Sequence, residues 1–199
     1  MKYFLPFENE IAQYMRENYS ELEREFFQYI YPLERYEKPR YIRKNGVLLY
    51  LGRIDLVPLK IARILLDDNE LNAAGWTDVN ESYKYPFSKR YPEQNEKLIH
   101  WNKLLETFSD SIEQLFFNIA FPEATLSYHY GVTKHCWRAH VCLQENQGFK
   151  FVIEDESKAW FKGMDDSFIF DDGNLWHGIE YTDVGDKTPR VVCILDYKK

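Results

Sequence analysis

Residues 124–143, ATLSYHYGVTKHCWRAHVCL, determine how the rest of the chain is interpreted. The segment starts with a β-branched and aromatic run, passes through Gly131–Lys134, and continues from Cys136 with alternating small and apolar residues. β-Branched and aromatic residues favour strands, and a glycine between two such runs favours a turn. The sequence therefore predicts two strands, with His129 at the end of the first and His140 inside the second.

The rest of the chain after Ser111 continues this pattern of short apolar runs separated by turn-forming residues. Such a succession of strands is typical of a sandwich or barrel. We expect strands at IEQLFFNIAF (112–121), ATLSYHY (124–130), CWRAHVCL (136–143), FKFVIED (149–155), SKAWFKG (157–163), DSFIFDD (166–172) and RVVCILDY (190–197).

The first 110 residues have a different character. Apolar residues recur at helical spacing over residues 8–31, a helix that Pro32 is expected to end, and again over residues 95–108. At 199 residues the chain has the length of one domain. We expect a single domain, with residues 1–110 as a helical and loop part and residues 111–199 as the core.

Between the two helical segments we expect a strand pair and a loop. Residues 41–57 are predicted to form a hairpin with Asn45–Gly46 at its turn, and a short amphipathic helix is predicted from Leu59. Residues 72–94 are rich in Asn, Gly, Pro, Tyr and Ser. Long loops often cover sites, so this segment is a candidate lid, although an ordinary surface loop explains it as well.

Composition narrows the class of partner and compartment. The formal net charge of −7 argues against nucleic acid or an anionic membrane surface as a partner. The three cysteines form neither a zinc motif nor a disulfide framework. The N-terminus has no secretory apolar region, and no run reaches transmembrane length. We therefore expect a cytoplasmic protein.

Histidines on separate strands point to a metal. Imidazole suits iron, zinc, copper and nickel, and an arginine such as Arg190 suits an anionic co-substrate. Non-haem Fe(II) oxygenases add a carboxylate to two histidines, yet Gly131 stands two residues after His129. Asp171 and Asp172 precede His177, but strand neighbours point to opposite faces, so neither is assigned as a ligand. Taken singly, each histidine is more often a structural residue.

The motifs of the second half occur in a characteristic order. This order resembles the aspartyl/asparaginyl β-hydroxylase family, a branch of the Fe(II)/2-oxoglutarate dioxygenases, over about residues 111–197. The matching pieces are Leu115-Phe116-Phe117-Asn118, Pro122, His129-Tyr130-Gly131-Val132-Thr133, Arg138-Ala139-His140, Trp160-Phe161-Lys162-Gly163, Phe170-Asp171-Asp172, His177 and Arg190.

The resemblance implies a mainly β fold with flanking helices, whose core is a double-stranded β-helix (a jelly-roll, cupin-like barrel). It also implies that His129 and His177 are the two iron ligands. Gly131 would stand where most dioxygenases place the Asp or Glu ligand, with water completing the coordination sphere. Arg190 would form the salt bridge to the distal carboxylate of 2-oxoglutarate, in keeping with bidentate arginine–carboxylate chemistry.

The resemblance implies further residues in the same pocket. Arg138 and His140 would reach the co-substrate or an acidic substrate, and Asn118 falls where the family often has a serine near the co-substrate. The family often has a second arginine where this chain has Cys136. The loss of that cation disfavours an aspartyl side chain as the substrate.

The expected activity is hydroxylation of an unactivated C–H bond of an amino acid, or of a residue in a peptide or carrier-bound substrate. The cofactors would be Fe(II), 2-oxoglutarate and O2, and the co-products succinate and CO2. One alternative is an Fe(II)/2-oxoglutarate halogenase that binds halide in the open position at Gly131. Another is a non-catalytic jelly-roll that binds a small molecule or a protein.

Overall fold

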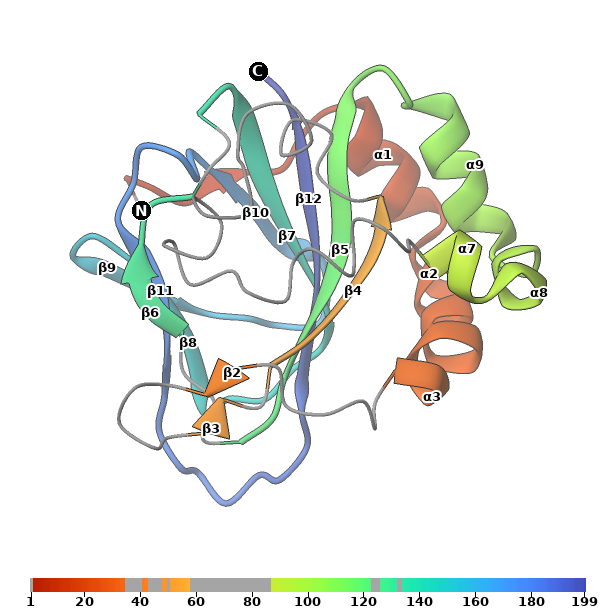
Figure 1. Cartoon of the computed structure of the whole chain (residues 1–199). Coiled ribbons are helices and arrows are strands. Elements are labelled where there is room, and N and C mark those ends of the chain that lie inside the picture. Colours follow the sequence, from red (N-terminus) through yellow and green to blue (C-terminus); the bar gives the residue numbers. More distant parts are fainter. Residues whose placement is uncertain are drawn as a thin grey trace.

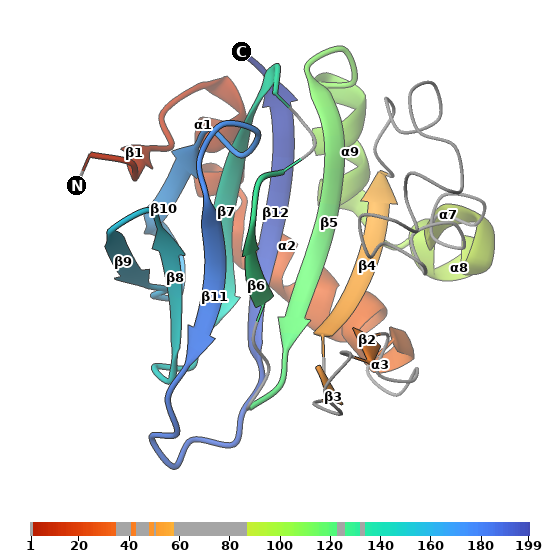
Figure 2. The ribbon, with the colours of Figure 1, turned by 60° about the vertical axis from the view of Figure 1, so that its left-hand side comes forward.

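The computed structural model describes residues 2–34, 41–42, 48–49, 51–57, 87–122, 126–131 and 134–199. Two β-sheets lie face to face, and helices cover the outer face of the larger sheet (Figures 1 and 2). The larger sheet has six strands in the order β1-β10-β7-β12-β5-β4, and the smaller has four in the order β6-β11-β8-β9. The paired strands are antiparallel. This arrangement is a double-stranded β-helix, which confirms the predicted fold class.

The strands of the core lie close to the predicted segments. A strand that we did not predict, β11, carries His177, and its short sequence HGIEY gives little signal. The strands of the two sheets are β1 Leu5–Pro6, β4 Leu51–Val57, β5 Ile112–Ala120, β6 Leu126–His129, β7 Cys136–Gln144, β8 Phe149–Ile153, β9 Glu156–Ala159, β10 Gly163–Phe170, β11 His177–Tyr181 and β12 Arg190–Lys198.

The predicted hairpin is present, but only its strands are described. Strand β2 (Tyr41–Ile42) pairs with β3 (Leu48–Leu49), and the predicted turn between them lies outside the described residues. Strand β4 pairs with β5 and so extends the larger sheet. The helix predicted from Leu59 also lies outside the described residues.

The helices differ from the prediction at their ends. The expected helix over residues 8–31 is a series that breaks at Asn18 and continues past Pro32 into α3, because proline is tolerated in the first turn of a helix. The end of the predicted loop contains two short helices, so that part of the loop prediction was wrong. The helical segments are α1 Glu10–Glu17, α2 Tyr19–Glu25, the π-helix η1 Phe26–Ile30, α3 Tyr31–Glu34, α7 Phe87–Arg90, α8 Pro92–Asn95 and α9 Ile99–Thr107.

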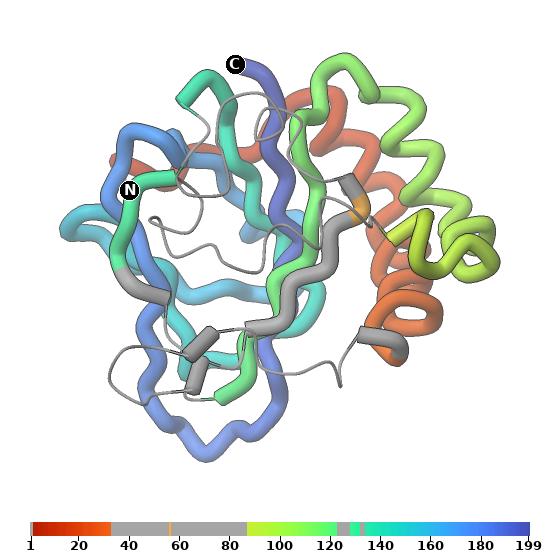
Figure 3. Tube along the Cα trace, in the orientation of Figure 1, coloured from red at the N-terminus to blue at the C-terminus, as the bar shows by residue number. Residues whose placement is uncertain are grey.

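Alternation along the strands creates two apolar cores. One face of β12 carries Val191, Cys193 and Leu195, which pack against the helices. The other face carries Val192 and Ile194, which pack inside the barrel against the smaller sheet. Because side chains alternate along a strand, polar residues on the same face of β12 as Val192 and Ile194 also face the barrel interior. Figure 3 shows the helices on one side of the larger sheet and the smaller sheet on the other.

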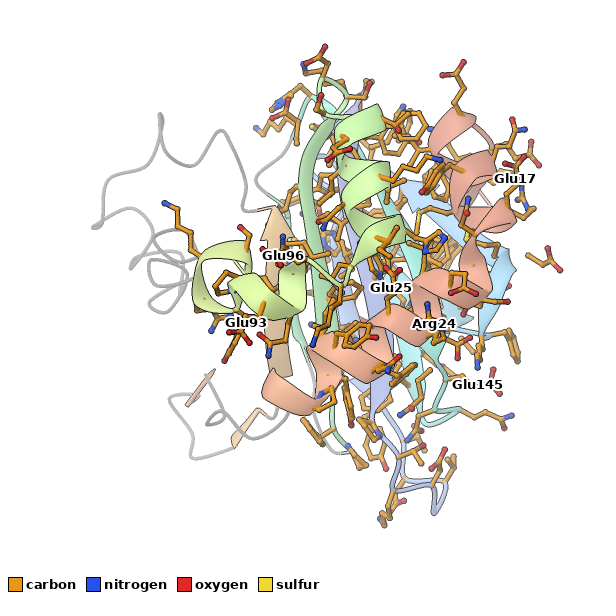
Figure 4. All side chains as sticks on the ribbon, turned by 90° about the vertical axis from the view of Figure 1, so that its right-hand side faces the viewer. Glu17, Arg24, Glu25, Glu93, Glu96 and Glu145 are labelled. Atoms are coloured by element: carbon orange, nitrogen blue, oxygen red, sulfur yellow. The ribbon has the colours of Figure 1, made fainter. Side chains whose placement is uncertain are left out.

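A buried carboxylate fixes the helical layer in place. Glu25 lies in this layer (Figure 4) and is fully buried. It accepts hydrogen bonds from the backbone N–H groups of His100 (3.1 Å) and Trp101 (3.4 Å) and contacts His100 Nδ1 at 2.7 Å. These N–H groups belong to the first turn of α9, where helices leave donors without internal partners. Glu25 therefore joins α9 to α2 behind the larger sheet.

Candidate functional site

Strand pairing brings the two predicted iron ligands together. His129 is the last residue of β6, His177 is the first residue of β11, and the two are direct partners across the strands. Their ring centroids are 4.5 Å apart. Nδ1 of His177 lies 2.8 Å from the carbonyl oxygen of Leu175. A carbonyl only accepts, so Nδ1 donates to it, and Nε2 is the ring nitrogen left to bind a metal.

A carboxylate that the sequence analysis set aside lies beside this pair. Asp172 is fully buried, and its Oδ1 lies 3.2 Å from Nε2 of His177. It also forms an ion pair with Arg138. Burial opposes its charged form, but the Arg138 guanidinium and the His177 hydrogen bond outweigh this effect and hold the pKa of Asp172 at about 2. The carboxylate is therefore ionised beside the His177 nitrogen that would bind a metal, and a cation bound there would be stabilised by the negative charge.

Asp172 also fills the space beside Gly131. The Gly131 N–H donates to the backbone oxygen of Asp172 at 2.8 Å. A Cβ atom placed on Gly131 would lie 1.5 Å from Oδ2 of Asp172. The carboxylate thus occupies the position into which a side chain at residue 131 would project.

The sequence argument against Asp172 rested on a predicted strand over residues 166–172, on which Asp171 and Asp172 would point to opposite faces. In the structure β10 ends at Phe170, and a turn leads to β11, so strand alternation does not apply. The turn separates the two aspartates: Asp171 pairs with Lys199 (2.6 Å), whereas Asp172 points inward. The glycine and asparagine that follow Asp172 could have indicated this turn.

Arg190 lies deep inside the barrel, close to its predicted neighbours. It is 1% exposed, and its Nη2 donates to Oδ1 of Asn118. Its Cζ atom is 4.0 Å from the ring centroid of Trp160 and 5.4 Å from that of Phe149. Burial lowers the pKa of Arg190 to about 9. In the described part of the chain no carboxylate forms a salt bridge with it, so its charge lacks a counter-ion there.

Three buried nitrogens around Arg190 have no hydrogen-bond partner among the described residues: Nδ1 of His140, Nε1 of Trp160 and Nε of Arg190 itself. Burial, with the nearby arginines, holds the pKa of His140 well below its ordinary value, so its ring is neutral. Leaving a buried polar group unpaired costs about 1–3 kcal/mol. Unpaired donors beside an unpaired cation suit an anion with several acceptor oxygens.

Arg138 was expected to reach the co-substrate or an acidic substrate. In the structure its Nε and Nη2 each donate to Asp196 at 2.7 Å, and its Nη1 donates to Asp172. Burial opposes its charge, yet the two carboxylates raise its pKa overall. Arg138 therefore holds Asp172 in place beside the histidines.

The barrel interior thus contains a pair of facing histidines and, in the same core, a cluster of unpaired buried nitrogens around Arg190. Among the residues that the structure describes, no group of three or more His, Cys, Asp or Glu side chains is arranged to hold a metal ion. The described part of the site accordingly offers His129 and His177 with an ionised carboxylate close by. Solvent molecules would complete a coordination sphere based on two histidines.

This strand order defines a cupin-type barrel protein. The sequence model of the aspartyl/asparaginyl beta-hydroxylase family matches residues 64–199. The chain belongs to this family. No curated protein matches the chain.

Solved structures with a similar fold are remote. The cupin domain of Cnp3 from Schizosaccharomyces pombe is 13% identical, with a TM-score of 0.35, over 45% of this chain and 54% of that one. A predicted oxalate decarboxylase from Thermotoga maritima is 14% identical, with a TM-score of 0.37, over 48% of this chain and 74% of that one. Scores this low support no inference of their own. The fold assignment depends on the strand order given above.

None of the helices in the described ranges is long and apolar enough to cross a membrane.

Proposed function

We propose that the protein is an Fe(II)/2-oxoglutarate-dependent dioxygenase. It would hydroxylate an unactivated C–H bond of an amino acid, or of a residue in a peptide or carrier-bound substrate. The observation that carries this proposal is the position of Arg190, His140 and Trp160, whose unpaired buried nitrogens lie in the same barrel interior as the facing histidines. A dianionic co-substrate supplies the missing counter-charge and the missing acceptors.

One set of residues would bind the metal, and another would bind the co-substrate. His129 and His177 would hold Fe(II), and Arg190 with Asn118 would bind the distal carboxylate of 2-oxoglutarate. When bound, the metal activates O2, and the co-substrate is converted to succinate and CO2. The neutral His140 ring can donate one hydrogen bond to the co-substrate without adding charge. The surrounding aromatic side chains exclude water from the pocket.

The halogenase alternative requires an uncharged, open position at Gly131. That space holds the ionised carboxylate of Asp172 instead. A halide placed there would meet a buried negative charge, which strongly disfavours its binding. This arrangement favours hydroxylation. The remaining alternative, a non-catalytic binding protein, differs from the proposal in having no affinity for iron.

The test is anaerobic visible absorption during addition of Fe(II) and then 2-oxoglutarate to metal-free protein. A charge-transfer band should form with 2-oxoglutarate, and it should be lost in Arg190→Ala. His129→Ala and His177→Ala should lose the band and succinate production. The matched control is His135→Ala, because His135 is exposed outside the barrel and should leave both unchanged.

Wild-type protein that neither binds Fe(II) nor develops the band would show that the histidines are structural. The binding-protein alternative would then replace the proposal. Normal succinate production by His129→Ala or His177→Ala would remove the assignment of that histidine as a ligand.

A further inference from the structure

Trp160 occupies an unusual position beside the buried cation. It follows β9 directly and is 2% exposed. Sequence alone interprets such a residue as apolar core. Its indole face, however, lies 4.0 Å from Cζ of Arg190, and its Nε1 has no hydrogen-bond partner among the described residues. The residue therefore combines a contact that stabilises a cation with an unused donor.

The stacked geometry determines how Arg190 can bind. A guanidinium donates its hydrogen bonds in its own plane, whereas aromatic rings pack over its face. Trp160, at 4.0 Å, and Phe149, at 5.4 Å, lie close enough to pack in this way. Within this plane, Nη2 of Arg190 donates to Oδ1 of Asn118, and Nε has no hydrogen-bond partner in the described structure. A carboxylate is thus directed to the remaining edge of the guanidinium.

The unpaired indole N–H of Trp160 lies among the side chains that surround Arg190. The His140 ring is stacked at 21° to the Trp160 ring, with centroids 6.0 Å apart. Nε1 of Trp160, Nε of Arg190 and Nδ1 of His140 are all buried and all unpaired in the described structure. One carboxylate offers about four lone-pair positions and can accept from more than one of these donors.

We propose that Trp160 is a co-substrate-binding residue that selects a dicarboxylate. Its indole face positions the Arg190 guanidinium, and its Nε1–H donates to the same far carboxylate that Arg190 binds. This inference rests on the proposed function, because the ligand is the 2-oxo acid co-substrate. It adds a second role to a side chain whose burial otherwise suggests packing alone.

The experiment compares two ligands that differ only at the far end. 2-Oxoglutarate carries a carboxylate there, and 2-oxopentanoate carries a methyl group on the same carbon chain. Binding of each to anaerobic Fe(II)-loaded protein is measured by calorimetry. The variants are Trp160→Phe, which keeps a stacking face and loses the N–H, and Trp160→Leu, which loses both. Trp137→Phe is the control, because Trp137 packs with the other core and under Lys199.

A hydrogen bond to a charged group corresponds to roughly 10- to 100-fold in affinity. Trp160→Phe should weaken 2-oxoglutarate binding by about that factor and leave 2-oxopentanoate within about twofold of wild type. Trp160→Leu should weaken 2-oxoglutarate further, and Trp137→Phe should change neither ligand. Thermal melting identifies any variant that is unfolded, and Trp160→Phe decides the question if Trp160→Leu does not fold.

Wild-type affinity of Trp160→Phe for 2-oxoglutarate would overturn the inference while leaving the proposed function in place. An equal loss for both ligands would overturn it as well, because it would indicate a packing role. If wild-type protein binds neither 2-oxo acid, the proposed function itself fails.

Discussion

Substituting Gly131 with alanine tests how tightly the site is built around Asp172. A new Cβ atom would lie 1.5 Å from Oδ2, 2.0 Å from Cγ and 2.4 Å from Oδ1 of Asp172. The positive φ angles among the described glycines occur at Gly163 and Gly185, so alanine at 131 meets no left-handed backbone there. The clash is therefore with the carboxylate, which must leave its contacts with Arg138 and His177.

The expected cost follows from the ion pair that is broken. Removing one partner of a buried ion pair costs about 3–5 kcal/mol. Arg138 keeps its bidentate pairing with Asp196, so we expect the lower end, about 3 kcal/mol. For a chain of this size that corresponds to a melting temperature lower by roughly 6–12 °C. Fe(II) affinity should fall as well, because the ionised carboxylate beside His177, which stabilises a bound cation, leaves its place.

The assay is a double-mutant cycle on the free energy of unfolding. Asp172→Ala removes the colliding group, so Gly131→Ala added to that background should change stability by less than about 1 kcal/mol. The coupling energy between the two positions should therefore be at least about 2 kcal/mol. Gly131→Asp should behave like Gly131→Ala or worse, since it adds a second negative charge in the same space.

Two results would refute this reasoning. One is a Gly131→Ala protein with wild-type stability and wild-type Fe(II) affinity. The other is an additive cycle, in which Gly131→Ala costs the same with and without the Asp172 carboxylate. Either would show that the carboxylate does not occupy the space beside residue 131.

Further outcomes can be measured by denaturant unfolding. The buried His140 has a lowered pKa, so the unfolded chain gains a proton near pH 6.5 that the folded chain does not. The free energy of unfolding should fall by about 1.4 kcal/mol for each pH unit below that value, and His140→Phe should flatten this slope. Equal slopes in the wild type and in His140→Phe would contradict the lowered pKa of His140. Arg138→Met leaves Asp172 and Asp196 buried without their cation and should lower the free energy of unfolding by about 3–5 kcal/mol. Arg138→Lys should recover only part of this loss, because an ammonium group restores the charge but not the bidentate contact with Asp196. Glu25→Ala should cost about 2 kcal/mol by leaving N–H groups at the start of α9 unpaired, and Glu25→Gln should cost less.

The sequence was sufficient for the features that depend on strand periodicity. Alternation along β12 places Arg190 on the same face as Val192 and Ile194, and the resemblance of motif order paired His129 with His177. The first feature is a property of one strand. The second joins β6 and β11 across 48 residues and was predicted only because the family resemblance supplied it.

Features that depend on long-range pairing could not be predicted. Arg138 meets Asp196 because β7 and β12 are neighbours in register, a contact between residues 58 positions apart. Asp172 was set aside because the predicted strand over residues 166–172 extends two residues beyond the end of β10 at Phe170. The unpaired nitrogen of Trp160 is invisible in the sequence, since apolar burial and ligand binding produce the same residue type in the same strand context.

Gly131 and the buried Asp172 are structurally linked, because the absence of a side chain at one leaves the space that the other fills. Iron oxygenases with two histidines and a carboxylate supply the carboxylate from a protein side chain. Here the strand that carries His129 supplies none, and the turn before His177 brings the Asp172 carboxylate into the vacant space. Arg138 on β7 binds Asp172 and is itself held by Asp196 on β12, so two strands and a turn determine the position of one negative charge. A glycine at this position therefore does not indicate an open site, because the side chain that fills the space, Asp172, comes from elsewhere in the fold.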